Sequence, residues 1–340
     1  MLSLTLSGCS LTGNSADVKT DGGVWKSTDN GRLWQQKSAI AVSGGQAKSF
    51  VNLDSVALTM DPGDHRTLYY GSIDQGLFYT YDAGNNWHIA TDLGPRPIGN
   101  IAVDVADKCN LFIVSISKVF KSTDCSRTWK EIYADNDPGQ LINAIVIDHY
   151  DSKVVYMGNE RGDIIRSSDA GDSWQTLHNF KGRVKKIVLN PTDSRVIFVL
   201  TENRGLFRSI DGGTEWLDMG TVMKEIRNTK LGRDIIASKV QPGLFLYATK
   251  YGLLKTINNG DDWTEINLIV PKNESQINSI AISDQDVNKV YYMTDTVFYS
   301  SIDGGANWTS QDLPTTRRGA NIVVDPIDAN VVYFAPIVRQ

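Results

Sequence analysis

The sequence predicts an all-β fold, a seven-bladed β-propeller whose blades are four-stranded antiparallel sheets. The first observation is a motif that recurs seven times, at a spacing of about 45 residues, which is typical of propellers and arrays. The second is a pair of short apolar segments, separated by a polar turn, between successive motifs. Four expected strands per period and no helical pattern indicate a ring of blades.

The motif, here called the box, consists of Ser or Thr, any residue, Asp, and a Trp five residues after the Asp, with Gly between them. Its Asp position is occupied by Asp29, Asp82, Asp124, Asp169, Asp211, Asn258 and Asp303. In such a turn the carboxylate accepts backbone N–H bonds, Gly supplies a positive φ, and the Trp packs between neighbouring blades. We therefore assign these residues a structural role. Asn258 replaces Asp in one copy, and Ser126 replaces Gly in the third.

The segments between boxes provide two inner strands, A and B. Residues 56–58 and 68–70 flank an Asp-Pro-Gly-Asp turn, and residues 187–189 and 196–198 flank Asn-Pro-Thr-Asp. Runs of β-branched and apolar residues bounded by such turns are typical of strands buried on both faces. The segment that ends in each box is then strand C, and strand D begins at the Trp.

The two ends of the chain predict how the ring closes. The chain begins with a C–D pair and ends with an A–B pair at residues 321–335. Pairing them completes the seventh blade and removes an open sheet edge. We therefore expect one propeller domain over residues 22–340, preceded by a signal remnant and flexible tether over residues 1–21.

The N-terminus contains Leu-Ser-Gly-Cys at residues 6–9, which resembles the lipobox of bacterial lipoproteins. That resemblance implies lipidation of Cys9 and an extracytoplasmic protein at the bacterial cell envelope, in contact with the membrane only through this anchor. Only eight residues precede Cys9, fewer than in an ordinary signal sequence. A secreted protein, or a cytosolic protein with a free Cys9, remains the alternative.

Two further cysteines occur in one predicted blade. Cys109 lies in its A–B loop and Cys125 in the imperfect third box, and both loops point to the same end of the propeller. A disulfide between them would close a loop of about 16 residues and contribute roughly 3 kcal/mol in the chain-entropy model. Export would make this bond chemically reasonable. Two unpaired, half-buried thiols are the alternative.

Composition excludes several functions. The chain is 41% hydrophobic and 21% charged with a net charge of −5, and no apolar run approaches the roughly 20 residues of a membrane-spanning helix. The four histidines are scattered without ligand spacing, so we expect no metal, and no cofactor motif is present. The acidic balance disfavours nucleic acid as a partner.

The boxes resemble those of the Asp-box, or BNR, propellers, which include sialidases, two-propeller xyloglucanases, Vps10 domains of sortilin-type receptors and photosystem II assembly factors with their bacterial relatives. The resemblance covers nearly all of residues 22–335. The Asp-Pro-x-Asp turns at Asp61 and Asp325 look closest to xyloglucanase and sortilin-like repeats. The resemblance implies the fold; the box itself is shared by enzymes and binding proteins.

The resemblance assigns no catalytic residue. A sialidase should carry Arg-Ile-Pro on its first inner strand, whereas this chain has Arg-Pro-Ile at residues 96–98. Xyloglucanases place their two catalytic aspartates on two facing propellers, and one propeller is predicted here. A single-propeller hydrolase would still need two carboxylates about 5 to 9 Å apart.

A binding site is expected at the mouth of the central channel, on the face opposite the boxes, where the D–A and B–C loops lie. Cations are in excess just before the inner strands. The predicted binding residues among them are Arg96, Arg183, Lys185, Lys186, Arg233, Arg317 and Arg318. Such a basic rim would attract an acidic partner; the alternative is that these side chains only solvate loops.

Two functions are therefore open. The favoured one is a lipid-anchored, non-catalytic, monomeric propeller that binds or helps assemble an envelope protein partner at its channel mouth. The alternative is a glycan-directed glycoside hydrolase or lectin of the sialidase or xyloglucanase kind. Clustered carboxylates and exposed aromatic side chains at the mouth would favour the alternative, and a broad cationic ring would favour the first.

Overall fold

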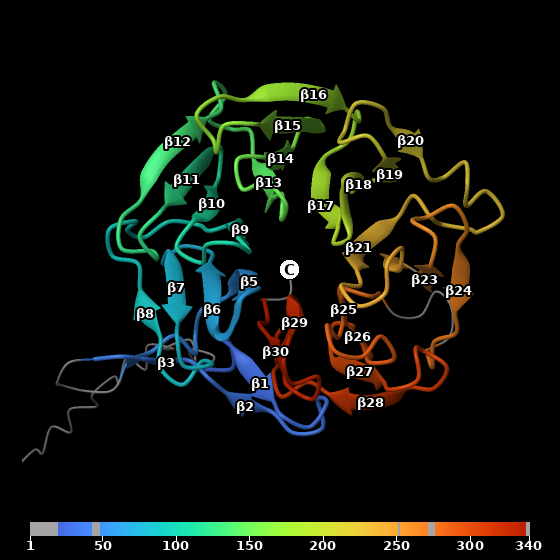
Figure 1. Ribbon diagram of the computed structural model, residues 1–340. Coiled ribbons are helices and arrows are strands. Elements are labelled where there is room, and N and C mark those ends of the chain that lie inside the picture. The colour runs from blue at the N-terminus through green and yellow to red at the C-terminus, as the bar shows by residue number, and fades with distance from the viewer. Residues whose placement is uncertain (1–19, 43–47, 251, 271–275, 338–340) are drawn as a thin grey trace, which may run out of the picture.

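The computed structural model describes residues 20–42, 48–250, 252–270 and 276–337. Within these ranges every helix-or-strand element is a β-strand, and seven four-stranded antiparallel sheets form a ring (Figure 1). The inner strands surround a central channel and the outer strands form the rim (Figure 1). The predicted seven-bladed β-propeller is confirmed.

Each blade runs from the channel outward in the order A, B, C, D. Blade 1 is β5 (Ser55–Asp61), β6 (Asp64–Ser72), β7 (Leu77–Thr80) and β8 (His88–Ile89). Blade 2 is β9 (Asn100–Val103), β10 (Leu111–Ser115), β11 (Lys118–Ser122) and β12 (Lys130–Ala134). Blade 3 is β13 (Ile142–Ile147), β14 (Val155–Asn159), β15 (Asp163–Ser167) and β16 (Gln175–Asn179).

The later blades repeat this plan. Blade 4 is β17 (Val184–Asn190), β18 (Asp193–Thr201), β19 (Gly205–Ser209) and β20 (Leu217–Asp218). Blade 5 is β21 (Gly232–Ala237), β22 (Phe245–Thr249), β23 (Gly252–Thr256) and β24 (Thr264–Ile266). Blade 6 is β25 (Ser279–Ile282), β26 (Val290–Met293), β27 (Val297–Ser301) and β28 (Thr309–Asp312).

Blade 7 closes the ring as expected, because its strands come from both ends of the chain. It consists of β29 (Ile322–Val324), β30 (Val332–Phe334), β1 (Trp25–Ser27) and β2 (Gln35–Gln36). β1 pairs antiparallel with β30, with Trp25 opposite Phe334. A small additional sheet of β3 (Ala39–Ile40) and β4 (Lys48–Ser49) lies beside blade 1 and was not predicted.

Apolar clusters pack the blades against one another. Trp87, Phe50 and Tyr70 of the blade 1 region pack in one cluster with Tyr333 of blade 7, and all four side chains are buried. Trp263 packs in the same way against a cluster that spans blades 4 and 5. Box tryptophans therefore lie between blades, and the burial of large aromatic side chains stabilises the ring.

The box turns use their polar groups internally. Ser167 donates a hydrogen bond to Asp169 at 2.8 Å and accepts one from the N–H of Gly171 at 2.8 Å. Asp169 in turn accepts the N–H of Ser173 at 2.8 Å. The Ser or Thr makes both of these bonds in all seven copies, and the amide oxygen of Asn258 accepts in place of a carboxylate.

The residue before the box Gly connects three parts of the ring. Ala170 adopts a φ of 60°, and its N–H donates to Lys153 in the A–B turn of the same blade, at 2.8 Å. Its carbonyl accepts the ammonium of Lys121 from the preceding blade at 3.0 Å. In the same way Arg208 of blade 4 donates to the carbonyl of Asn259 in blade 5 at 2.6 Å. The left-handed conformation therefore orients this peptide toward both its own blade and the neighbour.

The third box contains the predicted cysteine pair. The structure joins Cys109 and Cys125 as a disulfide between the A–B loop and the box turn of blade 2. Ser126 takes the position of Gly with a φ of 67°. Cys9 lies outside the described residues. In the described part of the chain, no helix has the length and apolarity needed to cross a membrane.

Candidate functional site

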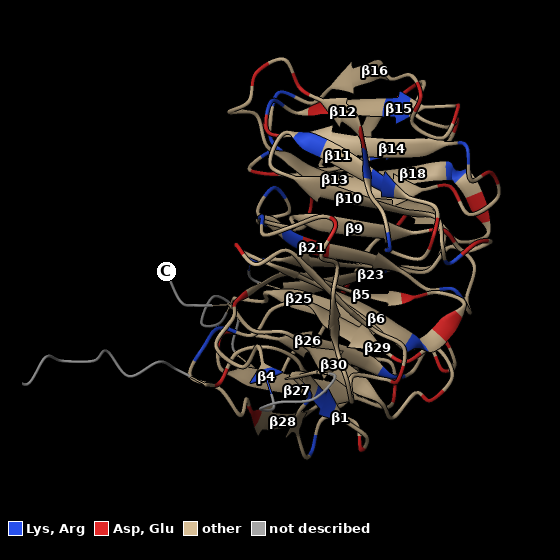
Figure 2. Ribbon diagram, turned by 90° about the vertical axis from the view of Figure 1, so that its left-hand side faces the viewer, with Lys and Arg blue, Asp and Glu red and all other residues tan. Residues whose placement is uncertain are grey.

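The two ends of the blades form two different faces. The box turns and A–B turns lie on one, here called the box face, and the D–A and B–C loops lie on the other, here called the loop face. Figure 2 shows that acidic and basic residues are concentrated at these two edges, with largely uncharged strands between them. Charge of both signs therefore occurs on the loop face, not a single basic rim.

The channel contains a cavity of about 470 Å³ lined by the beginnings of the inner strands. Its charged and hydrogen-bonding side chains come from all seven blades. They are Thr59, Asn100, Asn143, Lys185, Lys186, Arg233, Asp234, Asn278, Ser279 and Asn321. The lining is thus polar, with amides on several blades and charges concentrated on blades 4 and 5.

β-Bulges shape this lining. The register between strands A and B shifts at the same place in blades 1, 3, 4 and 5. The extra residues are Val56, Asn143, Lys185 and Arg233. A bulge leaves its extra residue outside the regular pairing and changes the direction of its side chain. Four of the seven inner strands therefore present a bulged residue to the cavity.

Asp234 connects three blades at the mouth. Its side chain pairs with the ammonium of Lys186 on blade 4 at 2.6 Å. Its other oxygen accepts the N–H of Ile280 on blade 6 at 3.0 Å. The residue is 7% exposed. The charge of Lys186 is consequently neutralised within the protein.

Arg183 lies at the edge of the mouth between two carboxylates. Its guanidinium is 3.2 Å from Glu160 and 3.9 Å from Glu202, and it donates to the amide oxygen of Asn143 at 3.3 Å. Both glutamates come from B–C loops and their side chains are 38% and 48% exposed. The three charged groups form an accessible cluster over blades 3 and 4.

The structure separates the seven predicted binding cations. Lys185, Lys186 and Arg233 line the cavity, and Arg183 lies beside it. Arg317 does not line it: its side chain is 4% exposed and pairs with Asp21 at 3.0 Å and with Asp54.

The other two predicted cations are also outside the cavity lining. Arg96 lies over the ring of Phe120, 4.6 Å from its centroid. Arg318 forms backbone hydrogen bonds with Ile337 at 2.8 and 3.0 Å. Sequence reasoning missed Asp234 and the amides of Asn100, Asn278 and Asn321. Their common position at the start of an inner strand is the signal that could have identified them.

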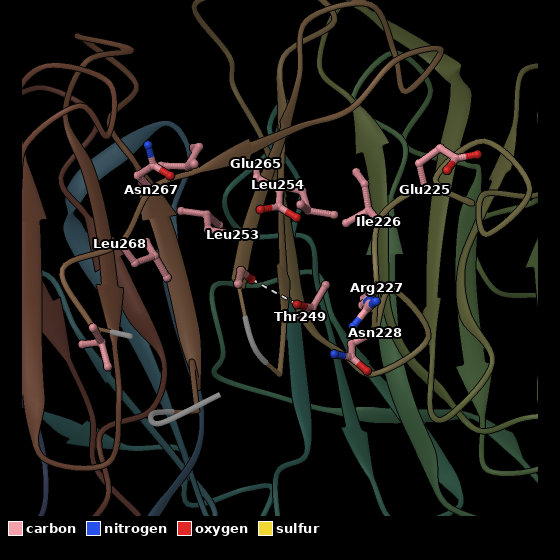
Figure 3. Close-up of a pocket in the computed structure, with 13 residues that line it drawn as sticks. Glu225, Ile226, Arg227, Asn228, Thr249, Leu253, Leu254, Glu265, Asn267 and Leu268 are labelled. Atoms are coloured by element: carbon pink, nitrogen blue, oxygen red, sulfur yellow. Dashed lines mark hydrogen bonds between the residues drawn. The ribbon is translucent and has the colours of Figure 1, made fainter. Parts of the chain in front are cut away.

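A second cavity, of about 480 Å³, lies on the loop face at blade 5. Figure 3 shows Leu254 and Glu265 on one wall and Glu225, Ile226 and Arg227 on the facing wall. The lining of both cavities, as far as the structure describes it, contains no aromatic side chain. Among the described residues, no three His, Cys, Asp or Glu are grouped to hold a metal ion.

Comparisons with known proteins place this fold beside those of GH74 enzymes and of YCF48. No family model matches the chain. A xyloglucanase from Paenibacillus sp. is 29% identical over 167 residues, which is 48% of this chain and 14% of that protein. The GH74 xyloglucanase structure from Xanthomonas campestris superposes with a TM-score of 0.69 at 18% identity, over 88% of this chain and 52% of that one. The structure of YCF48 bound to D1 peptide gives a TM-score of 0.64 at 16% identity, over 89% and 98%.

These findings correct the favoured function. The sequence relative is a xyloglucanase, which contradicts the predicted non-catalytic assembly scaffold and favours the hydrolase alternative. The likenesses to the GH74 structures and to YCF48 are all below 25% identity and show the fold alone. The chain spans about half the length of the GH74 structures and a small part of the curated relative.

Proposed function

We propose that this chain is a glycan-directed propeller of the glycoside hydrolase kind, which binds a polysaccharide such as xyloglucan across its loop face. The observation that carries the proposal is the 29% identity with a xyloglucanase over 167 residues. Within this proposal, the seven boxes are Asp boxes of the same propeller family. Since the chain matches only part of that enzyme, the experiment below tests binding and hydrolysis separately.

The chemistry of the channel mouth supports a sugar ligand. Sugar hydroxyls both donate and accept hydrogen bonds, and amide side chains offer both functions at once. Asn143 is held in place because its nitrogen donates to Glu160 at 3.2 Å while its oxygen accepts from Arg183. A cavity with a few fixed polar groups is the usual form of a small-molecule site.

For the chemical step we propose Glu160 and Glu202. Glycoside hydrolysis uses two carboxyl groups, roughly 5 to 9.5 Å apart. Both glutamates contact the single guanidinium of Arg183, at 3.2 and 3.9 Å, so the two carboxylates are neighbours at one cation. Both remain accessible from the loop face, as a pair flanking a polysaccharide must be.

The experiment incubates the purified chain with xyloglucan and measures both reducing ends and retardation in gels that contain the polysaccharide. We expect retardation and release of oligosaccharides. Glu160→Gln and Glu202→Gln should each lower the rate at least 100-fold, the scale of a lost general acid or base, while retardation persists. Glu131→Gln, which changes a glutamate paired with Lys118 on the outer edge of blade 2, is the matched control. Absence of both retardation and hydrolysis would overturn the proposal.

We also propose that Cys9 carries a lipid anchor that holds the propeller at the bacterial cell envelope. The support is the lipobox-like sequence at residues 6–9. Cells fed an alkyne-bearing fatty acid should label the wild-type chain, and Cys9→Ser should abolish the label.

A further inference from the structure

We propose that the channel mouth contains a carboxylate-binding subsite, in which Lys185 and Arg233 bind the carboxylate of a uronic acid unit in the glycan. This inference rests on the proposed function and deepens it, because it defines the class of sugar. It predicts that the chain prefers an acidic glycan to a neutral one.

The backbone brings the side chains of Lys185 and Arg233 close together. Lys185 and Arg233 are the extra residues of equivalent bulges in the neighbouring blades 4 and 5. The ammonium of Lys185 donates to the carbonyl of Gly232 at 3.1 Å, directly beside Arg233. Both residues line the same cavity. Bulges are over-represented beside functional sites because they redirect a side chain.

The charges around the mouth leave these two cations without a carboxylate partner. Asp234 pairs with Lys186, and Glu160 and Glu202 pair with Arg183. In the described ranges no ion pair forms on Lys185 or Arg233, and the hydrogen bond of Lys185 goes to a neutral carbonyl. Four cations therefore face three carboxylates, and the uncompensated charge lies on the bulged pair.

The electrostatic environment of Lys185 shows that its positive charge is destabilised beside Arg233. Burial and then the positive charge of Arg233 lower the pKa of the Lys185 ammonium, against the opposing effects of Glu202 and Asp234. Arg183 acts in the same direction as Arg233. Two half-buried like charges are unfavourable, and an anion bound between them would relieve the repulsion.

The surrounding groups favour a carboxylate carried on a sugar. A guanidinium matches the two oxygens of a carboxylate with parallel hydrogen bonds. The amide oxygens of Asn278 and Asn321, which line the same cavity, can accept hydrogen bonds from ring hydroxyls, whereas their amide nitrogens already donate within the protein. A volume of about 470 Å³ lies in the range of small-molecule sites. These features together fit one uronic acid unit.

The test compares acidic and neutral ligands by calorimetry. We expect a glucuronic acid-bearing xylan oligosaccharide to bind at least 10-fold more tightly than a neutral xyloglucan oligosaccharide. Lys185→Met and Arg233→Met should each remove most of this preference, because the affinity for the acidic ligand falls at least 10-fold more than the affinity for the neutral one. Arg195→Met, which changes an exposed cation paired with Asp193 on the box face, is the matched control. Thermal melting of each variant verifies folding, and Arg233→Gln provides a second, polar replacement.

The outcomes separate this subsite from the proposed function. Equal affinities for acidic and neutral oligosaccharides, or a preference that survives both Lys185→Met and Arg233→Met, would overturn the subsite and leave glycan binding intact. Binding of neither oligosaccharide would overturn the proposed function as well. Binding of an acidic peptide through Arg233, without binding of either sugar, would replace the uronic acid with a protein ligand and so reject the proposal.

Discussion

The box face and the loop face are built by the same repeat, yet the repeated residues are nearly the same on the box face and differ from blade to blade on the loop face. On the box face, the same Ser or Thr hydroxyl makes the same two hydrogen bonds in each of seven turns. On the loop face, the seven corresponding positions, at or just before the start of each inner strand, are Val56, Gly99, Asn143, Lys185, Arg233, Asn278 and Ala320. The comparison indicates that one face maintains the fold and leaves the other free to bind ligands.

The two faces differ because a residue in a box turn contacts more structural elements than a residue at the start of an inner strand. A box turn closes its own C–D hairpin, receives the A–B turn of its blade and accepts a donor from the preceding blade, as at Ala170. A change there disturbs two blades at once. A bulged residue such as Arg233 projects from one strand into the cavity, so it can be exchanged without loss of a strand pair.

The largest expected effect is loss of a buried box tryptophan. Trp87 is fully buried, its indole N–H donates to Lys37 at 2.8 Å, and its ring lies 5.4 Å from that of Phe50. Trp87→Ala should lower the free energy of unfolding by about 3 to 5 kcal/mol, as for other large buried aromatics. Trp129→Ala, at a half-buried box tryptophan of blade 2, should cost clearly less. Urea unfolding measures both, and equal losses would contradict the importance of burial.

A smaller effect tests the one predicted ligand-binding cation that the structure buries. Arg317→Met would leave Asp21 and Asp54 without their guanidinium and should cost roughly 3 kcal/mol, as for other broken buried ion pairs. Arg233→Met, on the same face, should change stability by no more than about 0.5 kcal/mol. Chemical denaturation of the two variants checks the difference. Similar losses would mean that the loop face is also held by its charges.

The architecture was predictable because its signal is repeated. Seven boxes and the split seventh blade define the ring, and the structure confirms both. The sheet of β3 and β4 was not predictable, since two-residue strands have no alternation. The burial of Arg317 was also missed. Its partners Asp21 and Asp54 lie 296 and 263 positions earlier in the chain, and only ring closure brings them together.

The site was predictable only in part, because the sequence does not show which charged side chains form ion pairs with one another. Lys185, Lys186 and Arg233 line the cavity from the inner strands β17 and β21, but their sequence positions do not reveal which charge is neutralised. Asp234 is adjacent to Arg233 in sequence and pairs instead with Lys186 on the preceding blade. Because of strand alternation and the bulge, the side chains of neighbouring residues point in different directions. The position of the bulge cannot be predicted from a single sequence.

The smallest expected effect is a decrease in the stability of the box face at low pH. The hydroxyl of Ser173 and then its backbone N–H lower the pKa of Asp169 to about 2, and Thr128 does the same for Asp124. Because a free aspartate titrates near pH 3.9, the folded state binds this proton less readily than the unfolded state. Stability from these carboxylates is therefore complete above about pH 4 and is lost as the pH falls toward 2. The box of Asn258 has no such proton to gain.

Asp169→Asn should consequently flatten the dependence of the urea midpoint on pH between about 4 and 2, because it gives blade 3 the neutral box that blade 5 already has with Asn258. Ser173→Ala keeps the carboxylate but removes the hydroxyl donor, so its slope should lie between those of the wild type and Asp169→Asn. Midpoints measured across this range decide the matter. A slope unchanged in both variants would show that acid acts elsewhere, and would remove the hydrogen-bonded carboxylates from the account of what holds the box face.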